Sequence, residues 1–574
     1  MRRSVFNPFS WGARGSAEET RRKPGRPRIA DRIGDYSDLV DESRTYWAEL
    51  RRDWEDLLDY YRDDEKQQSE LLAGLKATLD GDEDLAKAAA VVSNHIYSMV
   101  ETFAGTISQL PAAPVVVSPT REVDDYSQRI TSYLSAFSVK RNICNARMHR
   151  CRQAIVIGTG TMKVFWDPRI NDVRIAPISP MAVYPDPYTP DCTEPGEASF
   201  IAIRNIYSGR TMRRLFDGSN GGPKFDETKA EAVLGADEDA VETTEQDLSD
   251  GYVLWELYHE FGERLALYSG EQLYYDDDNP TPGGIYPVFF YPMAQWYGDF
   301  WGHSVLSHLV GLQSYINRTR SRILLREMYA TGPLMHGTDP QPKIDLKPGG
   351  YTEHHPDTQI EWWQPPGADP SVFTSLAKAQ ADFDAISGVF DITRGKREKG
   401  IQSGAALTAL ATQNEQRLVA PVEPWAYTEA RMWQCVMDLM RDNYLEDRTL
   451  SMMQGGEAVS VGITPADLAR AQYHVIMQAE QELPLTPLAL ADLASRALQL
   501  GAIDVLDWLD MVKFPNREAI KQRIMGQREA RLQGQQAAQE MLSQGRLAEQ
   551  GQAPISLPGE ILGGIPPQYA SGAY

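Results

Sequence analysis

The sequence predicts an α+β protein that is mainly helical and carries one β-rich layer. Helical periodicity dominates, because apolar residues recur at i, i+3 and i+4 over 36–62, 85–110 and 303–330. The period shortens toward two between 151 and 207, and alternation returns at 251–270, which indicates strands. With 574 residues, the chain is long enough to form more than one domain.

The composition is that of a globular protein with a strong acidic bias. Hydrophobic residues make up 42% of the chain, charged residues 24%, and the formal net charge is −23. A protein that coats DNA would carry a broadly basic surface, so the charge argues against that class. It is compatible with a channel that nucleic acid passes through, because an acidic wall repels a polyanion while a few local cations contact it.

Cysteines and apolar runs indicate the compartment. The chain has four cysteines, Cys144, Cys151, Cys192 and Cys435. They form no CxxC pair and have no histidine at zinc-site spacing, so we expect free thiols in a reducing cytoplasm. The N-terminus MRRSVFNPFSWGARG lacks the apolar run of a secretory signal, and no stretch approaches the roughly 18 apolar residues of a membrane span. We therefore expect cytoplasmic assembly and no membrane partner.

Two segments are expected to be solvated. Residues 1–33 hold nine lysines and arginines against three acidic residues, and the proline and glycine of RRKPGRPR disfavour a helix, which predicts a disordered basic arm. Its Gly25-Arg26-Pro27 core resembles an AT-hook, although a solvated or partner-bound tail is the stronger interpretation of one short match. Residues 226–250 contain ten acidic residues and a single lysine, which indicates a solvated insertion rather than a metal site.

Residues 34–302 are predicted to form a domain in which helices pack on the β-rich layer. The segments RQAIVIGTGTMKVFWDP (152–168) and NDVRIAPISPMAVYPDP (171–187) have the short period of strands. A further strand pair is expected at 251–270, with its turn at Gly262.

A helix, a Pro/Gly-rich block and a second helix follow at 303–330, 331–367 and 368–388. The first helix has an apolar stripe, with arginines on its other faces. In the second, Asp369 supplies an N-cap, Pro370 occupies the first helical position, and the helix closes at Gly388. The block between the helices holds Trp362 and Trp363, which either stack on bases or anchor an interface with a partner.

The next segment, 389–403, concentrates cations in an acidic chain. The four cations within six positions are Arg394, Lys396, Arg397 and Lys399, and the glycines that permit the loop to shift are Gly388, Gly395 and Gly400. Taken alone, the pattern is that of a solvated turn between two helices. Its place between a capped helix and a long helical pattern at 404–450, which must kink near Pro421 and Pro424, favours a loop that contacts nucleic acid.

The C-terminal part is predicted to be helical over 451–550 and extended over 551–574, where glycine and proline are frequent. The Gln/Ala-rich stretch 529–550 either continues as an oligomeric helix or frays.

No motif supports an enzyme, a metal site or a cofactor. GTGTMK (158–163) and GSNGGPK (218–224) lack the GxxxxGK[ST] spacing of a phosphate-binding loop, and the first lies in a strand pattern. His354 and His355 point apart in a strand, and no HExxH motif is present. The GxSxG elbow is also absent. We therefore predict a protein that is not an enzyme and has no catalytic residue, cofactor or metal.

The order of these segments resembles that of the portal (head-to-tail connector) proteins of tailed double-stranded DNA bacteriophages, from about Trp47 to Ala530. QAIVIGTGTMKVFWDP and VRIAPISPMAVYPDP look like the strand pair of the family's wing. GHSVLSHLVGLQSYINRTRSRIL looks like the helix that enters the stem. SGVFDITRGKREKGIQSGAALTAL looks like the tunnel loop with the start of the long wing helix, and GAIDVLDWLDMVKFPNREAIKQRI resembles the crown.

The resemblance implies a phage portal fold. It places the wing at 34–302, two stem helices at 303–330 and 368–388, the clip at 331–367, the tunnel loop at 389–403, the long kinked wing helix at 404–450 and the helical crown at 451–550. The four cations of the tunnel loop would project toward DNA, and Trp362 and Trp363 would dock partners at the clip.

The resemblance also implies a place in the virion. The protein would be a homododecamer at the unique capsid vertex, assembled in the bacterial host cytoplasm, and the conduit for double-stranded DNA during genome packaging and ejection. Its implied partners are the terminase large subunit, tail adaptor proteins, and the major capsid and scaffolding proteins. The alternative is a structural head-tail adaptor or virion protein that oligomerises without conducting DNA.

Overall fold

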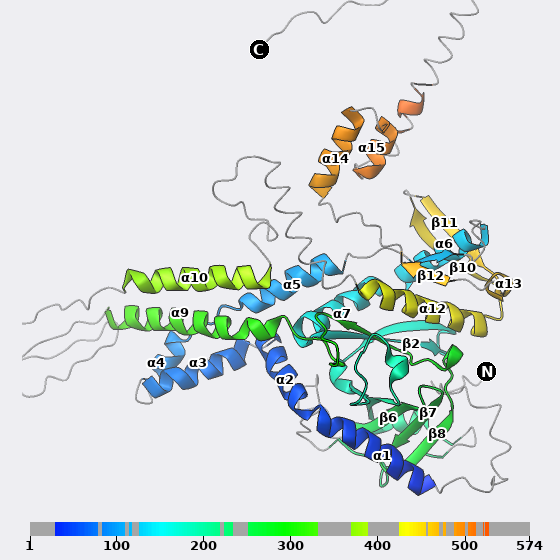
Figure 1. Ribbon diagram of the computed structural model, residues 1–574, viewed down its shortest axis with the longest axis horizontal. Coiled ribbons are helices and arrows are strands. Elements are labelled where there is room, and N and C mark those ends of the chain that lie inside the picture. The colour runs from blue at the N-terminus through cyan, green and yellow to red at the C-terminus, as the bar shows by residue number, and fades with distance from the viewer. Residues whose placement is uncertain are drawn as a thin grey trace, which may run out of the picture. The chain divides into compact units, whose positions relative to one another are not determined.

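The computed structural model describes the chain in separate stretches. They are residues 29–62, 64–78, 83–108, 114–117, 125–218, 223–233, 251–330, 369–388, 424–454, 457–469, 474–477, 487–499, 503–512, 520–521, 523–526 and 528. The chain divides into two units, Met1–Pro484 and Leu485–Tyr574, which are treated separately below. Helices and strands both contribute to the described part, so the prediction of an α+β protein is confirmed (Figure 1).

The first described elements are helices. They are α1 (Ile29–Tyr46), α2 (Ala48–Arg62), α3 (Asp64–Thr78), α4 (Glu83–Ala89) and α5 (His95–Ile107). The pattern at 36–62 is therefore two helices, and α1 begins inside the segment predicted as a disordered arm. The single helix predicted at 85–110 is wrong as one element, because 90–94 leaves helical geometry. Asn94 caps α5 at this break by accepting a hydrogen bond from the N–H of Tyr97 at 2.9 Å.

A three-stranded antiparallel sheet forms one β layer, in the order β3-β2-β9. Its strands are β2 (Thr159–Asp167), β3 (Asp172–Ile178) and β9 (Val288–Pro292). Helix α7 (Ile143–Ile157) packs on all three strands, and α6 (Asp125–Lys140) packs on α7. The strand predicted from 152 is wrong at its start, because 152–157 completes α7. Residues 154–157 are buried at every position, and periodicity cannot distinguish such a run from a buried strand.

A five-stranded antiparallel sheet forms the second β layer, in the order β4-β5-β6-β7-β8. The strands are β4 (Val183–Pro185), β5 (Ile201–Ser208), β6 (Gly251–His259), β7 (Arg264–Ser269) and β8 (Gln272–Asp278), with α8 (Gly209–Leu215) after β5. The turn predicted at Gly262 is confirmed; it joins β6 to β7 with φ 88°. Leu254 of β6 lies in the main core, whereas its neighbours Val253 and Trp255 lie in a second core with α1.

A buried charge pair joins the two sheets. The Lys163 ammonium of β2 contacts the Glu256 carboxylate of β6, and the two side chains are 13% and 6% exposed. The Tyr258 hydroxyl donates a further hydrogen bond to Glu256 at 2.7 Å, and the Asn205 amide donates another at 3.3 Å. These donors satisfy the carboxylate that burial would otherwise destabilise.

The remaining elements of the first unit are α9 (Val310–Ala330), α10 (Pro370–Ser387), α12 (Trp425–Asn443), β10 (Arg448–Gln454), β11 (Glu457–Ile463), α13 (Pro465–Ala469) and β12 (His474–Met477). Strands β10 and β11 pair as a hairpin, and β12 pairs with β1 (Pro114–Val117), far away in sequence. Two predicted boundaries are therefore wrong. The long helix of 404–450 ends at Asn443, and the region from 451 is not helical throughout. Strand pairing, of β10 with β11 and of β12 with the distant β1, overrides the helical pattern there.

The second unit contains α14 (Pro487–Gln499) and α15 (Val505–Met511). The Trp508 indole N–H donates to the Ser495 hydroxyl at 3.2 Å, and Ala494 and Leu509 are buried. The helical prediction is confirmed for these residues. In the part of the chain that the structure describes, no helix combines the length and apolarity needed to cross a bilayer.

Candidate functional site

Helix α10 begins and ends at the residues that its caps predict. The Asp369 carboxylate accepts a hydrogen bond from the N–H of Ser371 at 2.9 Å, and Pro370 occupies the first helical position. The hydrogen bonds from Ser371 lower the pKa of Asp369. At the other end, Gly388 adopts φ 72° and its N–H donates to the Asp384 carbonyl at 3.1 Å. Gly388 is therefore confirmed as the helix end.

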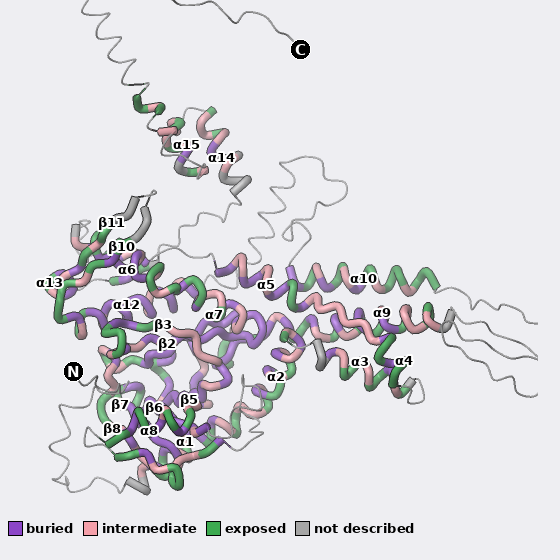
Figure 2. Tube along the Cα trace, turned by 180° about the vertical axis from the view of Figure 1, so that it is seen from behind, coloured by how far each residue is buried: buried purple, intermediate pink, exposed green. Residues whose placement is uncertain are grey.

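Helices α9 and α10 lie side by side and antiparallel (Figures 1 and 2). The Tyr315 hydroxyl of α9 is 2.6 Å from the Ser375 hydroxyl of α10, and Arg326 is close enough to Asp369 to contribute to lowering its pKa. The contact stripe of α10 follows one helix face and consists of Val372, Leu376, Ala379, Phe383 and Ser387. One face of α10 is thus packed, and the helix runs antiparallel to α9.

Most of the remaining α10 surface faces solvent in a single chain (Figure 2). Phe373 and Ile386 are both 49% exposed, although each is a large apolar residue. They lie near opposite ends of the helix, and isolated exposed apolar residues of this kind are common. The buried anchor is Phe383, 1% exposed, whose ring centroid lies 5.8 Å from that of His95 at the start of α5.

Helix α9 carries the cations of the pair. Arg318, Arg322 and Arg326 are exposed and Arg320 is half-buried, whereas Glu327 is the single acidic residue of the helix. The first helical turns are later than predicted, because 303–309 is not α-helical. Ser304 holds this entry segment: its hydroxyl donates to the Val156 carbonyl at 2.6 Å and accepts from the N–H of Leu306 at 3.0 Å.

Helix α12, which follows the cationic segment in sequence, is anchored by buried charges. The Glu429 carboxylate accepts hydrogen bonds from Arg147 and Arg150 of α7, and the Arg147 Nε bond is 2.9 Å long. Burial alone would raise the pKa of Glu429, but the two guanidinium groups outweigh it and lower this pKa to about 2. The Trp425 indole N–H donates to the Pro292 carbonyl of β9 at 2.6 Å, which holds the start of α12 against the three-stranded sheet.

The elements from β7 to the C-terminal unit match a known family. The family described as phage P22-like portal protein matches residues 264–556, just over half of the chain. The chain belongs to this portal protein family. A search of curated proteins found no match. Among solved structures, one titled "Virion of native gene transfer agent (GTA) particle" is similar with a TM-score of 0.36 and 10% sequence identity, covering 73% of this chain and 89% of that one.

Most of the site residues predicted for this portal protein lie outside the described residues. They are Arg394, Lys396, Arg397, Lys399, Gly395, Gly400, Trp362 and Trp363. Gly388 alone among the predicted site residues is described, and its use as a loop hinge stays a prediction. The exposed arginines of α9 were visible in sequence but received no role, because a helical pattern does not tell which of its faces neighbouring elements cover.

The glycines of GTGTMK in the portal protein have a packing role. Gly158 ends α7 with φ 107°, and a Cβ there would lie 2.1 Å from the Gly302 carbonyl oxygen. A Cβ at Gly160 would lie 2.3 Å from the Arg150 carbonyl oxygen. The motif also runs from helix to strand, the reverse of a phosphate-binding loop. The predicted strand is confirmed for Thr159–Lys163, which open β2, whereas Gly158 ends α7.

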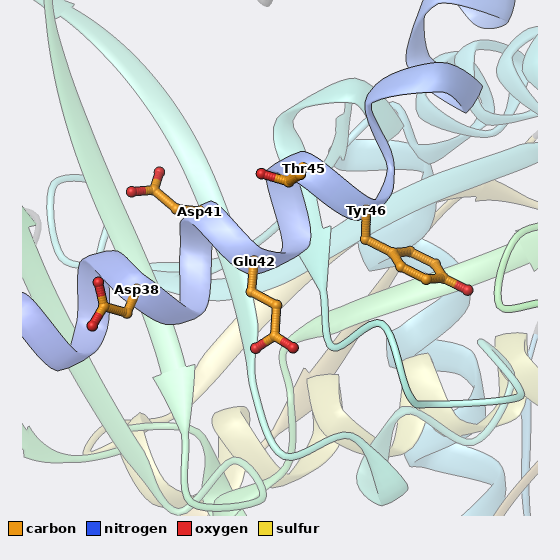
Figure 3. Close-up of a pocket in the computed structure, with 5 residues that line it drawn as sticks. All are labelled: Asp38, Asp41, Glu42, Thr45 and Tyr46. Atoms are coloured by element: carbon orange, nitrogen blue, oxygen red, sulfur yellow. The ribbon is translucent and has the colours of Figure 1, made fainter.

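A shallow depression lies on the solvent face of α1 (Figure 3). Asp38, Asp41, Glu42, Thr45 and Tyr46 line it, all from one helix. The lining is one exposed helical face that carries three carboxylates, and the Tyr188 hydroxyl interacts with Glu42 beside it. Within the described stretches, no group of three or more His, Cys, Asp or Glu side chains is placed to hold a metal ion.

Proposed function

We propose that this portal protein forms a dodecameric ring at the unique capsid vertex and conducts double-stranded DNA during genome packaging and ejection. The observation that supports this most strongly is the position of the cationic segment 389–403 between two anchored helices. It follows α10, which ends at the capped Gly388 and packs on α9, and it precedes α12, which Trp425 and Glu429 anchor. All of these elements lie within the range matched by the portal family.

The chemistry of the segment suits a conduit. Arg394, Lys396, Arg397 and Lys399, repeated in every subunit, would form a collar of cations facing the phosphate backbone. Phosphate contacts are independent of base sequence and weaken with salt, as a pore for any genome requires. The formal net charge of −23 on each whole subunit would prevent tight binding along the path. The exposed arginines of α9 would add cations to the wall of the conduit.

The remaining assignments extend the same proposal. The region 331–367 would form the clip, where Trp362 and Trp363 dock the terminase large subunit and later the tail adaptor proteins. The region 34–302 would form the wing, α9 and α10 the stem, α12 the end of the wing helix, and the C-terminal unit part of the crown. Major capsid and scaffolding proteins would surround the ring. The protein would have no catalytic role, so that packaging is powered by its partner.

Electron microscopy of the purified full-length protein tests this function. We expect rings with a central pore wide enough for a DNA duplex. A protein that stays monomeric at micromolar concentration under several buffer conditions would contradict the proposal. A ring whose pore excludes a duplex would instead identify a head-tail adaptor. Turnover of DNA or ATP in the presence of a divalent metal would overturn the non-catalytic assignment.

A further inference from the structure

The buried side of α9 is polar for three successive turns. Gln313 and Ser321 are 0% exposed and Asn317 is 4% exposed, although buried helix positions are usually apolar. Their i, i+4 spacing places all three on one face of the helix. Burying an amide or hydroxyl without a partner is costly, so this polar stripe must be matched by groups on the elements that α9 contacts.

The matching groups belong to the non-helical segment between α4 and α5, residues 90–94. The Gln313 side-chain carbonyl accepts from the N–H of His95 at 3.0 Å, and its amide donates to the Ser93 carbonyl at 2.6 Å. The Asn317 side-chain carbonyl accepts from the N–H of Ser93 at 3.1 Å. The Ser321 hydroxyl accepts from the N–H of Val91 at 3.0 Å. Side chains of α9 thus supply acceptors for the N–H groups of Val91, Ser93 and His95.

The two amides also bind one another and reach a third element. The Gln313 amide donates to the Asn317 side-chain carbonyl at 3.0 Å, and the Asn317 amide donates to the Gln67 side-chain carbonyl of α3 at 2.9 Å. Gln67 in turn donates to the Tyr60 carbonyl of α2 at 2.8 Å. Donors and acceptors therefore alternate along one connected set, in which each amide has a single satisfactory orientation.

Apolar packing accompanies the polar stripe along α9. Leu309 and Ile316 lie in the main core, while Leu325 and Met328 pack beside a small separate cluster that includes Leu71 of α3. Apolar contact is non-directional, so it holds α9 against these helices without specifying one position along its axis. A buried polar group whose partners are fixed excludes neighbouring registers, as a single buried asparagine does in coiled coils.

We propose that Gln313, Asn317 and Ser321 are positioning residues that set the register of α9 against residues 91–95, and with it the position of α10. Any axial shift of the α9–α10 pair must break or exchange these hydrogen bonds. The importance of this register for DNA passage rests on the proposed function, whereas the register itself does not.

Hydrogen exchange of the full-length protein tests the proposal at the amides concerned. In Asn317→Leu, which keeps a similar volume, we expect peptides covering 91–95 to exchange at least tenfold faster while peptides from β5 and β6 are unchanged. The matched control is Arg322→Gln, on the exposed side of the same helix, which should exchange as wild type. Unchanged exchange at 91–95 in Asn317→Leu, or equal acceleration in the control, would overturn the proposal.

A second pair of variants decides the matter if Asn317→Leu does not fold. Ser321→Ala should accelerate exchange at Val91, and Ser321→Thr, which retains the hydroxyl, should restore it. Equal exchange in the Ala, Thr and wild-type proteins would overturn the proposal. A DNA-passage assay on the wild type and the same variants separates the register proposal from the proposed function. If the variants exchange faster but no ring conducts DNA, the proposed function is rejected and the register proposal stands.

Discussion

Arg150 of α7 and Glu429 of α12 form an ion pair in which both side chains are 1% exposed, although they lie 279 positions apart. Arg147 supplies a second guanidinium to the same carboxylate, and the Arg150 guanidinium carbon lies 4.0 Å from the centre of the Tyr291 ring. The carboxylate therefore has two counter-charges and hydrogen bonds from both arginines, and Arg150 also packs on an aromatic ring. It connects the helix that enters β2 with the helix that follows the cationic segment.

Replacing Glu429 by Gln should destabilise the protein strongly. The substitution leaves Arg150 buried without a counter-charge, for which we expect a loss of roughly 3 kcal/mol in unfolding free energy. Urea unfolding at fixed protein concentration measures the loss. Glu446→Gln, at an exposed position just after α12, is the control and should change stability by less than about 0.5 kcal/mol. A loss no larger than that of the control would show that the ion pair does not anchor α12.

The contribution of Glu429 should also depend on pH. Its pKa is lowered in the folded protein to about 2 from an ordinary value of 4.5, so the folded state favours the ionised form. This stabilisation is present above pH 4.5 and decreases as the pH falls toward 2. The stability difference between wild type and Glu429→Gln should therefore shrink as the pH is lowered from 5 to 3.5. Thermal unfolding of both proteins at each pH measures this difference. A difference that stays constant across this window would contradict the lowered pKa.

Replacing Gly158 by Ala should be severely destabilising. The methyl group would lie 2.1 Å from the Gly302 carbonyl oxygen, and φ 107° is unfavourable for an L-residue with a side chain. We expect a loss of about 3 kcal/mol or more, measured by chemical unfolding. Gly196→Ala is the control, because no heavy atom lies within 4 Å of its added Cβ. Similar stabilities for the two variants would refute the close approach of 158 and 302.

Replacing Gly388 by Ala should destabilise the end of α10. An alanine at φ 72° is expected to cost roughly 1–2 kcal/mol, which should appear as faster hydrogen exchange in the last turn of the helix. Gly105→Ala provides a control of opposite sign. It lies inside α5 with no heavy atom within 4 Å of the added Cβ, so it should stabilise by about 0.5–1 kcal/mol.

The double variant Lys396→Ala with Arg397→Ala tests the cationic segment. We expect ring assembly to remain intact while DNA packaging or retention falls, and the remaining DNA association to depend less on salt because two phosphate contacts per subunit are lost. Arg210→Ala with Arg214→Ala removes two exposed cations from α8 and serves as the control. Normal packaging and retention in the first variant would exclude the role assigned to these cations.

Signals within a few residues predicted several elements well. The N-cap at Asp369, the proline after it and Gly388 predicted both ends of α10, because capping depends on hydrogen bonds spanning only a few residues. The turn at Gly262 between β6 and β7 was equally local. The boundaries that failed, at 152–157 and beyond 443, depend on what covers the segment. Residues 474–477 form a strand because 114–117 pairs with them.

By itself, the sequence determined the α+β class, the capped α10 helix and the position of the cationic segment, since each follows from composition, periodicity or short-range hydrogen bonding. Only the tertiary structure decided that Gln313 and Asn317 bind the non-helical segment before α5, more than two hundred positions earlier. It also decided that Glu429 is buried between two arginines. A buried polar side chain is stable only beside its partners, and the fold alone brings those partners together.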